Sequence, residues 1–314
     1  MDGVSIRFRV GYVTSPAPLY YERFTPVADG DRPVMVLVHG GCLSGACYLG
    51  TPDGRPGWAD DFAGQGYDVV VPDWPGIGRS GSVSEHPLSG DLVCAALGAL
   101  LEQVGRPVVL LVHSMAGPFG YRLVETHGNL IEALVAVAPG PPGNIQPEPV
   151  VVAETDSEIE LAGPLARWRF PKSGGYIATE QFVQEKLIGR ESTRFPRHAV
   201  DVFRAGLLPL PAPLLLQRQN LRGGQLRVER ADNFAGLPLL IVTGSADLEH
   251  PRDADGTTAG WLAGLGADVE YRFLADAGIT GNGHMLMLED NSREIALSIA
   301  GWLERTAIPS STGR

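Results

Sequence analysis

The sequence predicts an α/β protein with a mostly parallel central sheet flanked by helices and an inserted, mainly helical cap. Short β-branched runs alternate with segments of helical spacing in the first and last parts of the chain. This alternation is typical of βαβ units and a parallel sheet. It stops at about residue 140 and resumes at about residue 233. We therefore expect a core formed by residues 1–140 and 233–314, and a cap formed by residues 141–232.

Composition and charge narrow the class of protein. The 314 residues are 44% hydrophobic and include 40 glycines and 25 prolines, which suits a globular fold with many tight turns. The formal net charge of −11 disfavours nucleic acid or an anionic membrane surface as a partner. No basic segment precedes a long apolar run, so we expect no signal peptide and no membrane span.

The cysteines and histidines show no metal-ligand spacing. The three cysteines are Cys42, Cys47 and Cys94. An odd number of cysteines without metal-ligand spacing predicts free thiols in a reducing compartment. We therefore expect a cytoplasmic protein without a metal or another cofactor.

The first elements are predicted to be strands that lead into a glycine-rich loop. Residues 4–9 and 19–24 alternate in polarity and predict an antiparallel hairpin. The run 33–39, PVMVLVH, predicts a buried strand that ends in Gly40 and Gly41. Because paired glycines let backbone amides approach a ligand, the N–H of Gly41 or Cys42 could bind an oxyanion. A glycine-rich turn without a ligand is the alternative.

The middle of the core contains the most informative stretch. After a strand at 67–73 and a helix at 88–104, the run 108–117 reads VVLLVHSMAG. A buried strand that turns sharply into a helix at one serine is a nucleophile elbow, here at Ser114. The Met115 amide would then be free to stabilise an oxyanion. The usual pattern G-x-S-x-G is altered, because Val112 stands where glycine is usual, and Ser114 could instead only cap the helix.

The segment after the next helix (120–126) and strand (131–138) is read as the cap. Its arginines are interspersed with a similar number of acids. This mixture favours a solvated surface, although a bound substrate carboxylate is possible. The apolar run 207–216, LLPLPAPLLL, could line an acyl pocket or bury a homodimer contact, with ordinary cap core as the default.

The last part of the core supplies two further candidates. The strand 238–244, PLLIVTG, is followed by Asp247, and the strand 269–273 is followed by His284 in a glycine-rich loop. A closing helix is expected at 291–303. Open parallel sheets place their sites at the carboxyl ends of the strands, where Ser114, Asp247 and His284 all fall.

These three residue types form a catalytic triad when they meet. A serine needs a histidine to take its proton, and a carboxylate must hold the imidazole in the correct tautomer. His284 has the best context for the base. We expect His113 to be structural and His39 to brace the loop at Gly41.

Six stretches carry a resemblance to a known family. They are HGGCLSG at 39–45, TPDGRPGW at 51–58, PDWPGIGRSG at 72–81, VHSMAG at 112–117, VAVAPGPP at 135–142 and GITGNGHMLMLEDNSREIA at 278–296. The chain resembles an α/β-hydrolase of the esterase/lipase type, and most closely a bacterial and fungal esterase group. The order Ser114, Asp247, His284 is the order that this fold uses.

One departure from that group concerns the acid. The resembling enzymes carry a glutamate in an EPG-like turn after the sixth strand, whereas this chain reads Ala138-Pro139-Gly140. Asp247 occupies the loop after the seventh strand of the core, where other α/β-hydrolases place the acid. Either the acid has moved to Asp247, which we favour, or it is lost and hydrolysis is impaired.

The resulting expectation is a serine hydrolase that cleaves a carboxylic ester, lactone or thioester of small size through an acyl-enzyme. His284 would remove the Ser114 proton, and amides of Met115 and of Gly41 or Cys42 would hold the oxyanion. The alternative is a non-hydrolytic lyase, cyclase or ligand-binding protein on a biosynthetic pathway, because fold does not fix function.

Overall fold

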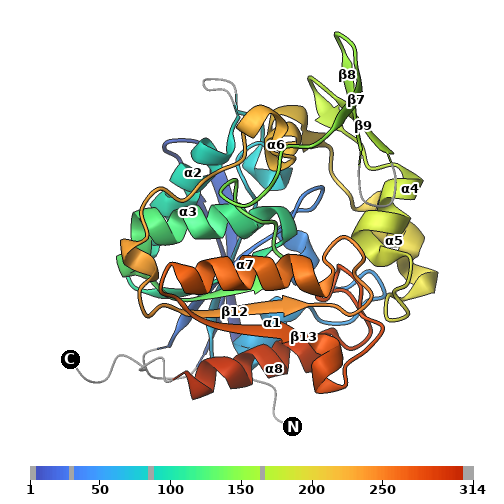
Figure 1. Ribbon diagram of the computed structural model, residues 1–314. Helices are drawn as coiled ribbons and strands as arrows, with labels where there is room; N and C mark the ends of the chain where they lie inside the picture. The colour runs from blue at the N-terminus through green and yellow to red at the C-terminus, as the bar shows by residue number, and fades with distance from the viewer. Residues whose placement is uncertain (1–4, 28–31, 84–87, 163–166, 307–314) are drawn as a thin grey trace.

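The fold is built on an eight-stranded sheet, shown in Figure 1. The computed structural model describes residues 5–27, 32–83, 88–162 and 167–306. The strand order is β1-β2-β4-β3-β5-β6-β12-β13. The strands are β1 (Ile6–Val13), β2 (Leu19–Pro26), β3 (Val34–Val38), β4 (Asp68–Pro72), β5 (Val108–His113), β6 (Ile131–Val137), β12 (Pro238–Thr243) and β13 (Asp268–Phe273).

The pairing of these strands confirms the predicted mostly parallel sheet. The six strands from β4 to β13 in this order run parallel, whereas β1 and β2 form an antiparallel hairpin and β2 also pairs antiparallel with β4. The hairpin was predicted, although Val4 at its expected start lies outside the described residues. Every residue of β3, β4 and β5 is buried, because helices cover both faces of a parallel sheet.

Helices cover the sheet on both faces, as expected. Figure 1 shows α2, α3 and α7 in front of the sheet and α1 behind it. On that rear face α1 is tied to α8 by the indole N–H of Trp58, which donates to the carbonyl of Ser292 at 2.9 Å. The helices of the core are α1 (Trp58–Gly64), α2 (Gly90–Val104), α3 (Gly117–His127), α7 (Arg252–Gly264) and α8 (Ser292–Arg305).

The cap lies between β6 and β12, and its composition corrects a prediction. Its first part is a three-stranded antiparallel sheet of β7 (Val151–Glu154), β8 (Glu158–Ala162) and β9 (Arg167–Pro171), so the expectation of a mainly helical cap is wrong there. This sheet projects at the upper right of Figure 1. The overlooked signal is the alternation of buried and exposed residues along EIELA and RWRFP, which has the period of a strand.

Helices follow this sheet in the second part of the cap. A two-residue pairing of β10 (Gly175–Tyr176) with β11 (Leu210–Pro211) closes the segment between them. The helices are α4 (Glu180–Phe182), the π-helix η5 (Val183–Gly189), α5 (Val200–Ala205) and α6 (Ala212–Arg218). None of the helices in the described part of the chain is long and apolar enough to cross a membrane.

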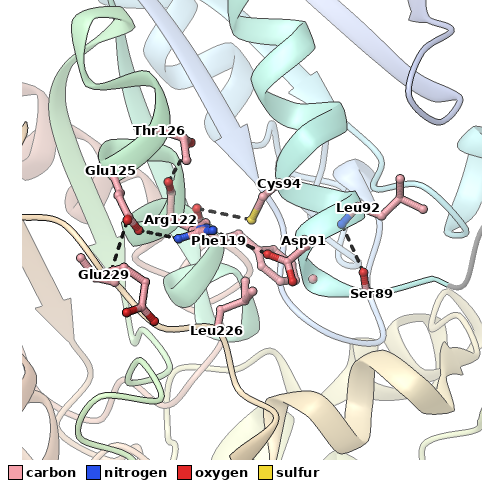
Figure 2. A network of polar contacts seen from close by, with 12 residues as sticks. Ser89, Asp91, Leu92, Cys94, Phe119, Arg122, Glu125, Thr126, Leu226 and Glu229 are labelled. Atoms are coloured by element: carbon pink, nitrogen blue, oxygen red, sulfur yellow. Dashed lines mark hydrogen bonds and ion pairs between the residues drawn. The ribbon is translucent and has the colours of Figure 1, made fainter.

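The chain returns from the cap to the core along α3, where a buried carboxylate holds it (Figure 2). Glu125 Oε1 accepts hydrogen bonds from the backbone N–H groups of Glu229 and Arg230 at 3.2 and 3.0 Å. Its other oxygen accepts from Arg122 Nη1 at 2.7 Å. Because α3 begins at the serine turn, this network connects the exit of the cap to the helix below the site.

Candidate active site

The turn at Ser114 has the strained geometry of a nucleophile elbow. Ser114 has a φ of 53° and starts a short 3-10 helix, η3 (Ser114–Ala116), which leads directly into α3. A non-glycine residue in this region costs about 1–3 kcal/mol, and such strain concentrates at functional sites. The unusual Val112 is accommodated by α3, because a Cβ at Gly120 would lie 2.9 Å from a Val112 methyl. The glycine that the strand lacks is thus supplied by the helix.

The three predicted triad residues meet at the carboxyl ends of their strands. The Ser114 hydroxyl lies 2.8 Å from His284 Nε2, and His284 Nδ1 lies 2.6 Å from Asp247 Oδ2. Burial acts to raise the pKa of Asp247, but the neighbouring imidazoles of His284 and His250 outweigh it and lower that pKa to about 2. An ionised Asp247 can only accept, so Nδ1 of His284 carries the proton and Nε2 is left to accept from Ser114.

The predicted oxyanion donors line the same pocket as Ser114 and His284. This pocket has a volume of about 100 Å³ and includes Gly41, Cys42 and Met115 in its wall. Within the described residues, the amides of Gly41 and Cys42 make no hydrogen bond to other groups. The Met115 amide lies in the first helical turn, where N–H groups have no intrahelical acceptor. Three donors are therefore available beside the serine.

His39 supports this loop from below. Its Nδ1–H donates to the carbonyl of Gly40 at 2.8 Å, and its Nε2 accepts from the Trp74 amide at 3.3 Å. The ring also stacks on Trp74, with centroids 4.4 Å apart. Burial lowers the pKa of His39 to about 4, so the imidazole stays neutral and retains both hydrogen bonds. This arrangement agrees with the bracing role expected for it.

Two further histidines flank the His284 ring. His113 Nε2 donates to the carbonyl of His284 at 3.1 Å, which fits a structural role. On the other side His250 stacks on His284 with centroids 5.1 Å apart. His250 Nδ1 bonds Asp255 at 2.9 Å, and Asp255 accepts from Thr243 at 2.5 Å. Burial would lower the pKa of His250, but Asp255 and Asp247 outweigh it and raise that pKa.

Sequence reasoning missed His250 and Asp255 as neighbours of the site. Both follow Asp247 within eight residues in the sequence DLEHPRDAD. The signal that could have found them is the density of acids and histidine directly after a strand end. In isolation, however, such a cluster is more often a solvated turn.

A second buried carboxylate fixes the loop that carries His284. Glu289 accepts from Gly283 N at 2.6 Å and Asn282 Nδ2 at 2.6 Å in that loop, and from Ser192 Oγ in the cap at 2.9 Å. A Cβ at Gly283 would lie 2.1 Å from the carbonyl of Ile188, so the cap lies directly on this loop. Cap and catalytic loop are therefore packed as one unit. Glu289 lies in the stretch 278–296 that carries the family resemblance, but its contacts were not predicted.

The turn where the resembling enzymes carry glutamate holds no acid here. Ala138 has a φ of 41°, and its amide donates to the carbonyl of Val242 at 2.8 Å. Two residues later, the Gly140 amide donates to the carbonyl of Ser114 at 2.8 Å. The turn thus contacts the serine through its backbone.

One cluster of the described residues could in principle ligate a metal ion. The donor atoms of Asp247, His250 and His284 lie within 4.8 Å of one another. Hydrogen bonds already use both ring nitrogens of His284 and one of His250. These hydrogen bonds occupy most of the nitrogen atoms that a metal ion would need, so the residues as arranged do not fit a metal site.

The cap forms the outer wall of the pocket. Leu210 and Leu215 of the apolar run 207–216 line it, together with Phe182 and Leu187. The run therefore contributes both to the buried core of the cap, which was its default interpretation, and to the wall of this pocket. The three cysteines are buried and free, and burial raises the pKa of Cys42 to about 12. The Cys42 thiol beside Ser114 is thus a protonated packing group.

Comparisons with known proteins agree with this architecture. A family model described as "Alpha/beta hydrolase family" matches residues 35–296. A fungal protein named "Probable secreted lipase phiG" (Fungal sp., strain ATCC 74256) is 25% identical over an alignment 356 positions long, gaps included, which covers 95% of this chain and 89% of the fungal one.

Solved structures extend the likeness at the level of the fold. A thermophilic esterase from Thermogutta terrifontis superposes with a TM-score of 0.57 at 15% identity, covering 96% of this chain and 99% of the esterase. A membrane phospholipase A gives a TM-score of 0.61 at 14% identity, covering 98% and 88%. The fold and the family match over most of the sequence together show that this chain belongs to the alpha/beta hydrolase family.

Proposed function

We propose that the protein is a serine hydrolase that cleaves a carboxylic ester, lactone or thioester through a Ser114-His284-Asp247 triad. The observation that carries the proposal is the unbroken chain of two short hydrogen bonds from the Ser114 hydroxyl to the Asp247 carboxylate. Serine is unreactive at neutral pH unless a positioned base removes its proton. The names of the fungal relative and of the Thermogutta structure also point to ester hydrolysis.

The mechanism follows from the positions of these groups. His284 Nε2 takes the Ser114 proton while Oγ attacks the carbonyl carbon, and the amides of Met115 and of Gly41 or Cys42 hold the oxyanion. When the intermediate collapses, His284 returns the proton to the leaving alcohol or thiol, and an acyl-enzyme remains. Water then gives its proton to His284 and attacks the acyl carbonyl, which releases the acid and restores Ser114.

The non-hydrolytic alternative finds no specific support in the geometry. Two sequence features favour this alternative: position 138 carries alanine instead of glutamate, and Val112 stands where glycine is usual. Asp247 provides a carboxylate beside His284, and Gly120 makes room for Val112. The cytoplasmic location and the homodimer stay predictions. The name of the fungal relative describes that protein, by contrast, as secreted.

The first prediction tests the nucleophile. Ser114→Ala should lower kcat for p-nitrophenyl esters by about 10⁴-fold or more, because triad members act as a unit. A fluorophosphonate probe should label the wild type at Ser114, and it should label neither Ser114→Ala nor His284→Ala. Ser44→Ala, a change on the nearby loop, is the matched control and should be labelled normally. Full turnover by a clean Ser114→Ala preparation would refute the mechanism.

A further inference from the structure

The catalytic pocket shares a wall with a second cavity under the cap. The second cavity has a volume of about 260 Å³ and extends from the shared wall toward Trp168 and Phe170 of β9. The residues that line both cavities are mostly polar. They are Lys186, Arg218, Gln219, Glu249 and His250. When a substrate is bound at Ser114, the group that extends away from its scissile bond therefore contacts this polar wall.

Arg218 connects this wall to the turn that contacts Ser114. It ends α6, and its guanidinium lies against Gly140, where an added Cβ would be 2.7 Å from Nε and 2.8 Å from Nη2. The Gly140 amide in turn donates to the carbonyl of Ser114 at 2.8 Å. One glycine thus separates the guanidinium from the backbone of the nucleophile. The absence of a side chain at Gly140 is what leaves room for it.

The guanidinium of Arg218 has no anionic partner within the described residues. Its one side-chain hydrogen bond runs from Nη1 to Gln146 Oε1 at 3.3 Å, and no carboxylate oxygen lies within 4.0 Å. The neighbouring carboxylates Glu249 and Asp255 each have partners other than Arg218. Lys186 pairs with Glu249 at 2.5 Å, and Asp255 accepts from Thr243 and His250.

Other arginines of the cap differ from Arg218 in this respect. Arg169, Arg190 and Arg222 each pair with a glutamate and point to solvent, with side chains that are 61–70% exposed. Arg218 is half-buried in the pocket wall and stays charged, because a guanidinium does not lose its proton in proteins even though burial lowers its pKa. A partly buried charge without an ionic partner loses hydration that nothing in the protein replaces. Such a residue is expected where a ligand supplies the opposite charge.

We propose that Arg218 is the carboxylate-binding group of this site. The preferred substrates are then esters that carry a carboxylate on the part that contacts the wall shared by the two cavities. The planar fork of a guanidinium matches a carboxylate in a bidentate pair. A single negative charge fits better than a phosphate dianion, because Glu249 Oε1 is buried there without a partner and would repel additional charge. This inference rests on the proposed hydrolase function and specifies its substrate class.

The test compares isosteric charged and neutral esters. The acyl-side pair is the p-nitrophenyl monoester of adipic acid and p-nitrophenyl 6-methylheptanoate, in which two methyl groups replace the carboxylate oxygens. The alcohol-side pair is 4-carboxyphenyl acetate and 4-isopropylphenyl acetate. In at least one pair, Arg218→Gln should reduce the charged-to-neutral ratio of kcat/KM by about 10- to 100-fold, the range expected for a charged hydrogen bond. Dividing the variant's ratio by that of the wild type removes the intrinsic reactivity of the esters.

Arg169→Gln is the matched control, because it removes the same charge from the outer surface of the cap. It should leave both ratios unchanged. If Arg218→Gln does not fold, Arg218→Met retains the apolar stem against Gly140 and should give the same loss. Ratios that are equal in the wild type and in a folded Arg218 variant, for both pairs, would overturn the proposal.

A binding measurement separates this inference from the proposed function. Adipate should bind to Ser114→Ala in a calorimetric titration, and binding should weaken by about tenfold or more in Ser114→Ala/Arg218→Gln. This readout requires no turnover, so it stands even if no ester is hydrolysed. Equal adipate affinity in the two proteins would overturn the carboxylate site while leaving a serine hydrolase intact.

Discussion

The turns after β6 and β12 lie side by side, and each contacts a different residue of the candidate site. The strands pair directly, with Val137 opposite Val242. The β12 turn carries Asp247, which bonds His284, whereas the β6 turn carries Ala138 and contacts Ser114 through the Gly140 amide. The resemblance described in the sequence analysis implies a glutamate in the β6 turn, where this chain has Ala138.

The difference shows what each turn needs for its present contacts. An acid at β12 requires only a side chain that reaches Nδ1 of His284. A turn at β6 without the acid can pack tightly, since a Cβ at Gly117 would lie 2.7 Å from the Gly140 carbonyl. Gly140, which has no side chain, also leaves space for Arg218. In this chain a cation, Arg218, rather than an anion therefore lies beside the turn after β6.

Among the changes that test this comparison of the two turns, the largest effect is expected from removing the acid at the β12 turn. Asp247→Asn should lower kcat on the order of 10³- to 10⁴-fold, because an amide neither favours the required tautomer of His284 nor stabilises its protonated form. Steady-state hydrolysis of p-nitrophenyl butyrate measures this. Asp201→Asn, whose carboxylate is fully exposed on the cap, is the control. A loss of less than about tenfold would mean that Asp247 only shapes its loop.

An intermediate effect is expected from returning the acid to the β6 turn. In the Asp247→Asn background, Ala138→Glu should recover kcat by about tenfold or more, if the two turns are equivalent routes to the same imidazole. The Ala138→Gln change in that background has the same size without the charge and should recover nothing. Equal activities for the glutamate and glutamine variants would show that the turns are not interchangeable in this chain.

The smallest expected effect concerns the buried carboxylate on the far side of the His284 loop. Burial raises the pKa of Glu289 to about 7, although three hydrogen bonds oppose it. The folded state therefore binds this proton more tightly than the unfolded chain. As a result, Glu289 should make the free energy of unfolding fall as pH rises from about 4.5 to 7.

Glu289→Gln should remove that pH slope and lower kcat by about two- to tenfold, because an amide cannot accept from all three donors. Denaturant unfolding at several pH values and steady-state kinetics measure the two effects. Glu294→Gln, on the exposed side of α8, is the control. An unchanged slope would show that Glu289 is ionised throughout this range, and that burial alone does not set the charge of carboxylates near His284.

Much of the core could be predicted because its signals are local. Every core strand begins or ends within about three residues of its predicted position, since the period of buried residues along the chain sets it. Helices α1 and α7 were not predicted. The cap was misread in its first part, because the strand period in β8 and β9 spans only five residues each and is interrupted between them.

What the sequence by itself determined is the sheet, the turn at Ser114 and the placement of three candidate residues after strand ends. These follow from local periodicity and turn chemistry. Only the tertiary structure decided which acid lies beside His284, because that hydrogen bond joins residues 37 positions apart. Glu249 was another candidate for this place, and position 138 carries alanine instead of an acid. The tertiary structure also decided that Gly120 accommodates Val112 and that, among the arginines in the described part of the chain, Arg218 lines the pocket. Such pairings depend on which surfaces pack together, and no short stretch of sequence contains both partners.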